Sequence, residues 1–137
     1  MTEPFRDAFR APADLETIGR VHETFERLAE QRPELSAQVR GAFELAVVEV
    51  VTNVVTHSRD DRPVRVELVI RTTEGGLEAI ITDDAPPADV DVADPTMPEA
   101  EDLAESGRGL ALVTMLVDRF EHDTLDGTGN RWLLALG

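Results

Sequence analysis

One apolar stretch, residues 43–58, constrains the fold more than any other part of the chain. Within it, polar side chains recur at every fourth position, at Glu49, Asn53 and His57. A helix turns about 100° per residue, so these side chains lie along one stripe and the intervening valines fill the opposite arc. Valine also favours strands, but a strand would put Glu49 and Asn53 on one face with no polar alternation between them. The stretch predicts a buried helix that either satisfies a polar cluster or builds a site.

Composition restricts the class of protein. The chain has 137 residues, of which 42% are hydrophobic, so we expect a single domain over residues 1–137 with a normal core. It contains no cysteine, which excludes disulfides and thiolate chemistry. No segment has the pattern of a signal peptide or a membrane span, so we expect a cytoplasmic protein without membrane interactions.

The formal net charge of -15 disfavours direct binding to nucleic acid, because that affinity comes from cations that replace counterions. Between Glu74 and Asp126 the basic residues are Arg108 and Arg119 alone. Such acidity is typical of a highly soluble or salt-adapted surface. Alternatives are a basic protein partner, a metal-neutralised ligand, or a protein that mimics nucleic acid.

Hydrophobic periodicity and turn residues predict eight elements. Ser36 is suited to cap the central helix, and Pro33 ends the helix before it. The order of strands and helices predicts an α+β two-layer sandwich with a mixed, mostly antiparallel sheet. The predicted strands cover residues 5–10, 64–71, 77–82, 119–125 and 131–136, and the predicted helices cover 14–31, 36–58 and 106–117.

Asp83 has the same parity as the apolar residues Leu77, Ala79 and Ile81. If the strand continues, the Asp83 carboxylate points into the buried face and needs hydrogen-bond donors there. The other interpretation is that the strand ends earlier and Asp83 opens a turn with residues 84–87. The proline-rich composition of that segment favours the turn.

An acidic, proline-containing segment follows, and we expect a lid or binding loop at about residues 85–106. Gly107 and Gly109 then open a helix. Glycines there let an anion approach free N–H groups at the positive end of the helix dipole. Neither a Walker-type loop nor a dinucleotide fingerprint is present, because the lysine of the first and the preceding strand of the second are missing.

Glu49 and Asn53 form a pair of hard oxygen donors one helical turn apart. An asparagine carbonyl can bind Mg²⁺, which uses few protein ligands, and a glutamate can accept a proton or position water. The alternative is a buried polar ladder between helix and sheet. We interpret His57 as a structural residue near the helix C-terminus, where a cation is favoured.

In this order, the motifs resemble the Bergerat-type (GHKL) ATP-binding fold, and within it the bacterial anti-sigma-factor serine/threonine kinases. Residues 49–57 look like the Glu-x-x-x-Asn-x-x-x-His helix of that branch. Residues 80–85 look like its strand that ends in Asp-x-Gly, and residues 107–118 look like its glycine helix. Gly127-Thr128 resembles its terminal segment, so the resemblance extends from about Ala42 to the C-terminus.

The resemblance implies a fold in which three helices cover one face of the sheet, and a role for each matched residue. Asn53 would coordinate Mg²⁺ on the nucleotide phosphates, Glu49 would act as the catalytic base, and Asp83 would accept a hydrogen bond from the adenine amino group. The remaining nucleotide-binding residues implied are Gly107, Arg108, Gly109, Leu110 and Thr128.

The implied cofactors are ATP and Mg²⁺, and the implied reaction is phosphorylation of a serine or threonine in an anti-anti-sigma (STAS-type) protein. A sigma factor is the second implied partner, and the family resemblance also implies a homodimer. One segment departs from the family pattern, since Asp-x-Gly-x-Gly becomes Asp83-Asp-Ala-Pro-Pro87. That departure supports an alternative, a catalytically silent anti-sigma or adaptor module of the same fold that binds nucleotide weakly or not at all.

Overall fold

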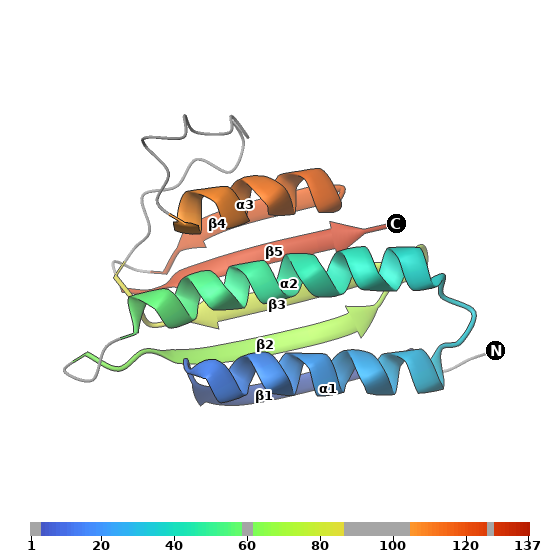
Figure 1. Cartoon of the computed structure of the whole chain (residues 1–137), viewed down its shortest axis with the longest axis horizontal. Helices are drawn as coiled ribbons and strands as arrows, with labels where there is room; N and C mark the ends of the chain where they lie inside the picture. Colours follow the sequence, from blue (N-terminus) through green and yellow to red (C-terminus); the bar gives the residue numbers. More distant parts are fainter. Residues whose placement is uncertain (1–3, 59–61, 87–104, 126–127) are drawn as a thin grey trace.

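The computed structural model describes residues 4–58, 62–86, 105–125 and 128–137, with the side chains of residues 57 and 105–108 outside that description. Strands and helices form two layers (Figure 1). The elements, in chain order, are β1 (Arg6–Pro12), α1 (Leu15–Gln31), α2 (Ala37–His57), β2 (Arg65–Thr72), β3 (Leu77–Asp83), α3 (Glu105–Leu116), β4 (Arg119–Thr124) and β5 (Asn130–Leu136).

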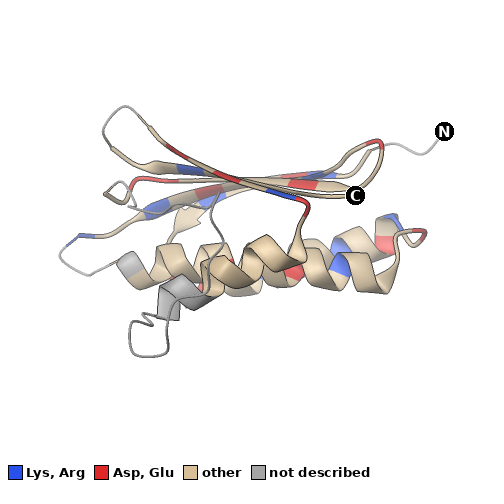
Figure 2. Ribbon diagram, turned by 90° about the horizontal axis from the view of Figure 1, so that it is seen from above, with Lys and Arg blue, Asp and Glu red and all other residues tan. Residues whose placement is uncertain are grey.

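The sheet has five strands in the order β1-β2-β3-β5-β4. All four pairings are antiparallel, so the predicted α+β two-layer sandwich is confirmed and the sheet has no parallel pair among its described strands. The helices cover one face and leave the other open, as the view in Figure 2 shows. Within the described residues, no helix is both long enough and apolar enough to cross a bilayer.

Helix α2 lies between α1 and α3 in the helical layer (Figure 1), and it is buried along one side as the valine-rich stretch predicts. The Ser36 side chain caps it and accepts a hydrogen bond from the Val39 N–H at 3.0 Å. Asp14 caps α1 in the same way, through the Thr17 N–H at 3.2 Å. The inner arc of α2 packs in the hydrophobic core, where its fully buried residues are Phe43, Ala46, Val47, Val50 and Val51.

Strand β3 continues through Asp83, so the early turn that the composition favours is wrong. Its residues alternate strictly between buried and half-buried, and Asp83 is 5% exposed. The strand continues because it is paired on both sides, with Val66 on β2 and Asn130 on β5 opposite Asp83. The buried face of β3 therefore ends in a carboxylate.

Four segments far apart in the sequence meet at one end of the molecule, on the left of Figure 1. They are the C-terminal ends of α2 and β3, the N-terminal end of α3 and the turn between β4 and β5. Most of the predicted lid at about residues 85–106 lies outside the described residues. The predicted site motifs thus converge even though the intervening loop is not described.

Candidate functional site

Glu49 on α2 lies directly against Gly109 on α3. A Cβ added to Gly109 would lie 2.5 Å from the Oε2 atom of Glu49, closer than real Cβ contacts allow. Glycine at position 109 thus lets the α3 backbone run alongside the carboxylate. The structure thus brings the acid of the motif at residues 49–57 into contact with the glycine helix predicted at residues 107–118.

Asn53 lies one turn after Glu49 and is 5% exposed. Its Oδ1 atom is buried and accepts no hydrogen bond from the described residues. An unpaired buried acceptor costs about 1–3 kcal/mol, so such a group in a native core calls for an explanation. A hard cation that binds the amide oxygen would satisfy it.

These residues fit a Mg²⁺ ion that arrives with a ligand. Mg²⁺ keeps several waters and is bound through one or two protein oxygens together with substrate phosphates. Within the described residues, no group of three or more His, Cys, Asp or Glu side chains could hold a metal. Asn53 Oδ1 is the described oxygen best suited to such an ion, and the other ligands would come from phosphate and water.

The Asp83 carboxylate accepts three hydrogen bonds. Its Oδ1 atom accepts one from the Ala85 N–H at 3.0 Å and one from Asn130 Nδ2 at 2.9 Å, and its Oδ2 atom accepts one from Trp132 Nε1 at 3.0 Å. All three donors are buried residues. The donors that a buried Asp83 was predicted to need are therefore present, and they belong to the protein itself.

Asn130 and Trp132 are site residues that the sequence analysis misses. They lie on β5, where Asn130 pairs with Asp83 and Trp132 pairs with Ile81, so both side chains lie on the helix-covered face. That Asn130 and Trp132 lie on the same face of a strand follows from their spacing of two residues in the sequence. What ties them to Asp83 is the register between β3 and β5, which no local pattern reveals.

A second layer of side chains supports Asn130 and Trp132. His122 on β4 lies with its Nε2 atom 2.8 Å from Asn130 Oδ1, and its ring centroid lies 4.3 Å from that of Trp132. Phe120 stacks on Trp132 from the same strand, with ring centroids 6.1 Å apart. The orientations of both donors to Asp83 are thus fixed by packing and hydrogen bonding from β4.

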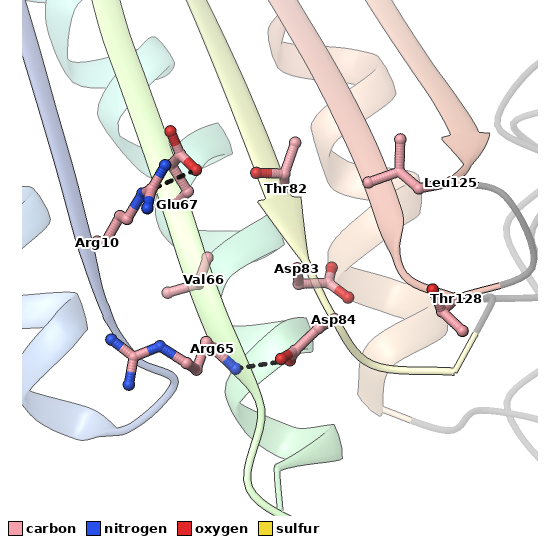
Figure 3. A pocket seen from close by; sticks show the side chains of 9 residues that line it. All are labelled: Arg10, Arg65, Val66, Glu67, Thr82, Asp83, Asp84, Leu125 and Thr128. Carbon is pink, nitrogen blue, oxygen red and sulfur yellow. Dashed lines mark hydrogen bonds and ion pairs between the residues drawn. The ribbon is translucent and has the colours of Figure 1, made fainter.

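The segment that departs from the family pattern still holds Asp83 in place. Ala85 is buried, and its N–H closes a turn onto the Asp83 carboxylate. The Asp84 side chain leaves in another direction and accepts a hydrogen bond from the Arg65 N–H at 2.7 Å (Figure 3). The extra negative charge of Asp84 is thereby separated from the Asp83 carboxylate, and Pro87 lies outside the described residues.

A pocket of about 380 Å³ lies at the ends of β2 and β3 (Figure 3). Most of its strand side chains alternate with buried ones, so it opens on the sheet face away from the helices. Thr128 lines this pocket and is exposed, and no described contact joins it to Glu49 or Asn53. The lining residues are Arg10, Arg65, Val66, Glu67, Thr82, Asp83, Asp84, Leu125 and Thr128.

The other predicted residues lie on α3 or at the end of α2. Leu110 is 7% exposed and packs in the core, next to the Gly109 contact with Glu49. Gly107 and Arg108 belong to the first turn of α3, but the Arg108 side chain lies outside the described residues, as does that of His57. The described geometry thus joins Glu49 to Gly109, leaves Asn53 unpaired one turn away, and holds Asp83 through β5.

The comparison with known protein families agrees with this geometry. A family model described as a histidine kinase-like ATPase domain matches residues 11–135. No curated protein matches the chain. The match covers nearly the whole sequence, including both helices and both strands that build the site, and the chain therefore belongs to the family of histidine kinase-like ATPase domains.

Proposed function

We propose that this protein binds Mg-ATP at the end of the sheet and transfers the γ-phosphoryl group to a serine or threonine hydroxyl of an anti-anti-sigma (STAS-type) protein. The observation that carries this proposal is the pairing of a carboxylate with an unsatisfied amide oxygen. Glu49 lies against Gly109, and one turn away Asn53 Oδ1 is buried with no hydrogen-bond donor in the part of the chain that the structure describes.

In this proposal Glu49 is the general base. Its half-buried carboxylate accepts the proton of the attacking hydroxyl as the new phosphate ester forms, and ADP leaves. When bound, ATP supplies the phosphoryl group and Mg²⁺ offsets the charge that develops on it. Asn53 contributes its Oδ1 atom to the cation, and its burial keeps that oxygen fixed.

In this proposal, contacts to the base at one end and to the phosphates at the other orient the nucleotide. Asp83 accepts a hydrogen bond from the base. The N-terminal part of α3, with Gly107, Arg108 and Gly109, lies where the helix dipole favours phosphate. Leu110 holds that turn in the core. Thr128 lines the pocket on the other face of the sheet, so its part in nucleotide binding is proposed from the family resemblance alone.

The proposed partners follow from the proposed reaction. The acceptor is a STAS-type protein, and the regulated partner is a sigma factor that is bound or released according to the phosphorylation state of the acceptor. A homodimer of this chain is also proposed.

Two measurements test the proposal. Calorimetry with Mg-ADP should show binding by the wild-type protein that Asn53→Ala abolishes. Labelled phosphate should move from Mg-ATP to a purified STAS-type acceptor, and Glu49→Gln should slow the transfer by about 10²-fold or more, as loss of a general base does. Gln38→Ala, an exposed change at the far end of α2, is the matched control and should alter neither.

The outcomes separate the kinase from a silent module. Nucleotide binding without transfer to any STAS-type protein would refute the kinase and leave a nucleotide-binding adaptor. Absence of Mg-ADP binding by the folded wild-type protein would refute the proposal altogether.

A further inference from the structure

We propose that Asn130 sets the base specificity of the site, by leaving the Asp83 carboxylate with one free acceptor position on Oδ2 and none on Oδ1. The inference rests on the proposed function, because it requires that Asp83 meets the base of a bound nucleotide. It adds a specificity-determining residue to which the family resemblance assigns no role.

The free positions follow from counting lone pairs. An ionised carboxylate has about four acceptor positions, two on each oxygen. Oδ1 of Asp83 accepts from the Ala85 N–H and from Asn130 Nδ2, which fills it. Oδ2 accepts from Trp132 Nε1 alone among the described residues, which leaves one position. Since Asp83 is 5% exposed, bulk water does not readily occupy that position.

Asn130 is held in the orientation that donates. Its Nδ2 atom faces Asp83 and also the Pro86 carbonyl oxygen at 3.2 Å, so its Oδ1 atom is the end that faces His122. His122 Nε2 therefore carries a proton and donates to Asn130. Because Asn130 is 2% exposed and its two ends have complementary partners, the amide cannot rotate without losing them.

The single free acceptor position on Asp83 Oδ2 can accept one hydrogen bond from a nucleotide base. Adenine presents a single amino group beside an acceptor nitrogen, so its amino group matches the free position on Oδ2. Guanine presents a ring N–H and an adjacent amino group, and a carboxylate binds that pair through both oxygens. With Oδ1 filled, one guanine donor would be buried without a partner, which costs binding. Hypoxanthine has the ring N–H but lacks the amino group, so it needs one acceptor only.

Asn130 and Trp132 provide a matched pair of substitutions. Asn130→Ala removes a donor from Oδ1 and opens the position that guanine needs. Trp132→Phe removes a donor from Oδ2 and leaves Oδ1 filled. Both variants delete one hydrogen bond to the same carboxylate, so general damage to Asp83 affects both, whereas a change in specificity affects only the first.

The test is calorimetry of Mg-ADP, Mg-IDP and Mg-GDP, with circular dichroism to confirm that each variant is folded. We expect the wild-type protein to bind ADP about tenfold or more tighter than GDP, which is about 1.4 kcal/mol, with IDP between them. Asn130→Ala should reduce the ADP/GDP ratio to about threefold or less. Trp132→Phe should weaken all three ligands and keep the wild-type ratio.

Each result of this experiment either supports or refutes the role of Asn130 in base specificity. Equal affinity of the wild-type protein for ADP and GDP refutes the inference and leaves the proposed function intact, and this arm needs no variant to fold. A folded Asn130→Ala protein that keeps the full ADP/GDP ratio also refutes it. If the folded wild-type protein binds none of the three nucleotides, the proposed function fails and the inference fails with it.

Discussion

The indole N–H of Trp132 donates to Asp83 Oδ2 at 3.0 Å, which ties the only tryptophan of the chain to the carboxylate at the end of β3. Asp83→Asn replaces an acceptor-only group by an amide whose NH₂ must face one of the donors that now bind Asp83. We expect the free energy of unfolding to fall by about 2 kcal/mol. Urea unfolding followed by Trp132 emission measures this directly.

The control for that experiment is Asp84→Asn. Asp84 is exposed, and Asn keeps the Oδ1 acceptor for the Arg65 N–H, so the change should stay within about 0.5 kcal/mol. If both variants lose the same free energy of unfolding, the three hydrogen bonds to Asp83 stabilise the fold no more than the single hydrogen bond to Asp84, and the prediction is wrong.

Gly109→Ala is expected to impair phosphoryl transfer more than folding. The new Cβ would lie 2.5 Å from Glu49 Oε2, and the far end of a flexible side chain can move away. Stability should change by less than about 1 kcal/mol. Displacement of the base by about 1 Å should lower kcat about 10²-fold with little change in KM.

Steady-state kinetics and thermal unfolding of Gly109→Ala check both parts. Gly41→Ala in α2 is the matched helical control, because a Cβ there meets nothing within 4 Å. It should keep wild-type kinetics and gain up to about 1 kcal/mol of stability. Wild-type kcat in Gly109→Ala would argue against Glu49 as the base.

Gly129→Ala is expected to destabilise the protein by about 3 kcal/mol. Gly129 has φ of +98°, and a Cβ there would lie 2.4 Å from the Asp83 backbone oxygen, which cannot move as a side chain can. Denaturant unfolding measures the loss. Gly19→Ala, where a Cβ meets nothing within 4 Å, should not destabilise, and a similar loss in both would contradict the prediction.

Asn53→Leu should separate stability from binding. Leucine has nearly the shape of asparagine but no polar atoms, so the variant removes the Oδ1 acceptor, which has no donor among the described residues. It should therefore gain about 1 kcal/mol of stability without ligand. It should also lose the rise in Tm that Mg-ADP gives the wild-type protein. Thermal unfolding with and without Mg-ADP measures both, and an unchanged ligand effect would exclude Asn53 as a ligand.

The elements that local patterns encode are the ones predicted from the sequence. The fourfold spacing of Glu49 and Asn53 in a valine-rich stretch predicts α2 and its polar stripe, and the parity of Asp83 correctly identifies its face if the strand continues. Whether the strand continues depends on pairing with β2 and β5, so the local turn composition of residues 84–87 favours the wrong interpretation.

The donors to Asp83 could not be predicted, because they depend on contacts between distant segments. Asn130 is 47 residues from Asp83, and only the strand register places them side by side. Gly109 is predicted as a glycine for phosphate, but its contact with Glu49 depends on how α2 and α3 pack. The prediction for Thr128 remains untested, and the structure puts that residue on the open side of the sheet.

The close approach of Gly129 to the Asp83 backbone makes orientation of this carboxylate a long-range event in folding. Two of the three donors to Asp83, Asn130 and Trp132, lie on β5, 47 and 49 residues further along the chain. Helix α2 brings Glu49 and Asn53 together through local structure, whereas Asn130 and Trp132 reach Asp83 only after β5 has paired with β3. The two sides of the proposed site therefore depend on different stages of folding, the metal side on a helix and the base side on a late strand pairing.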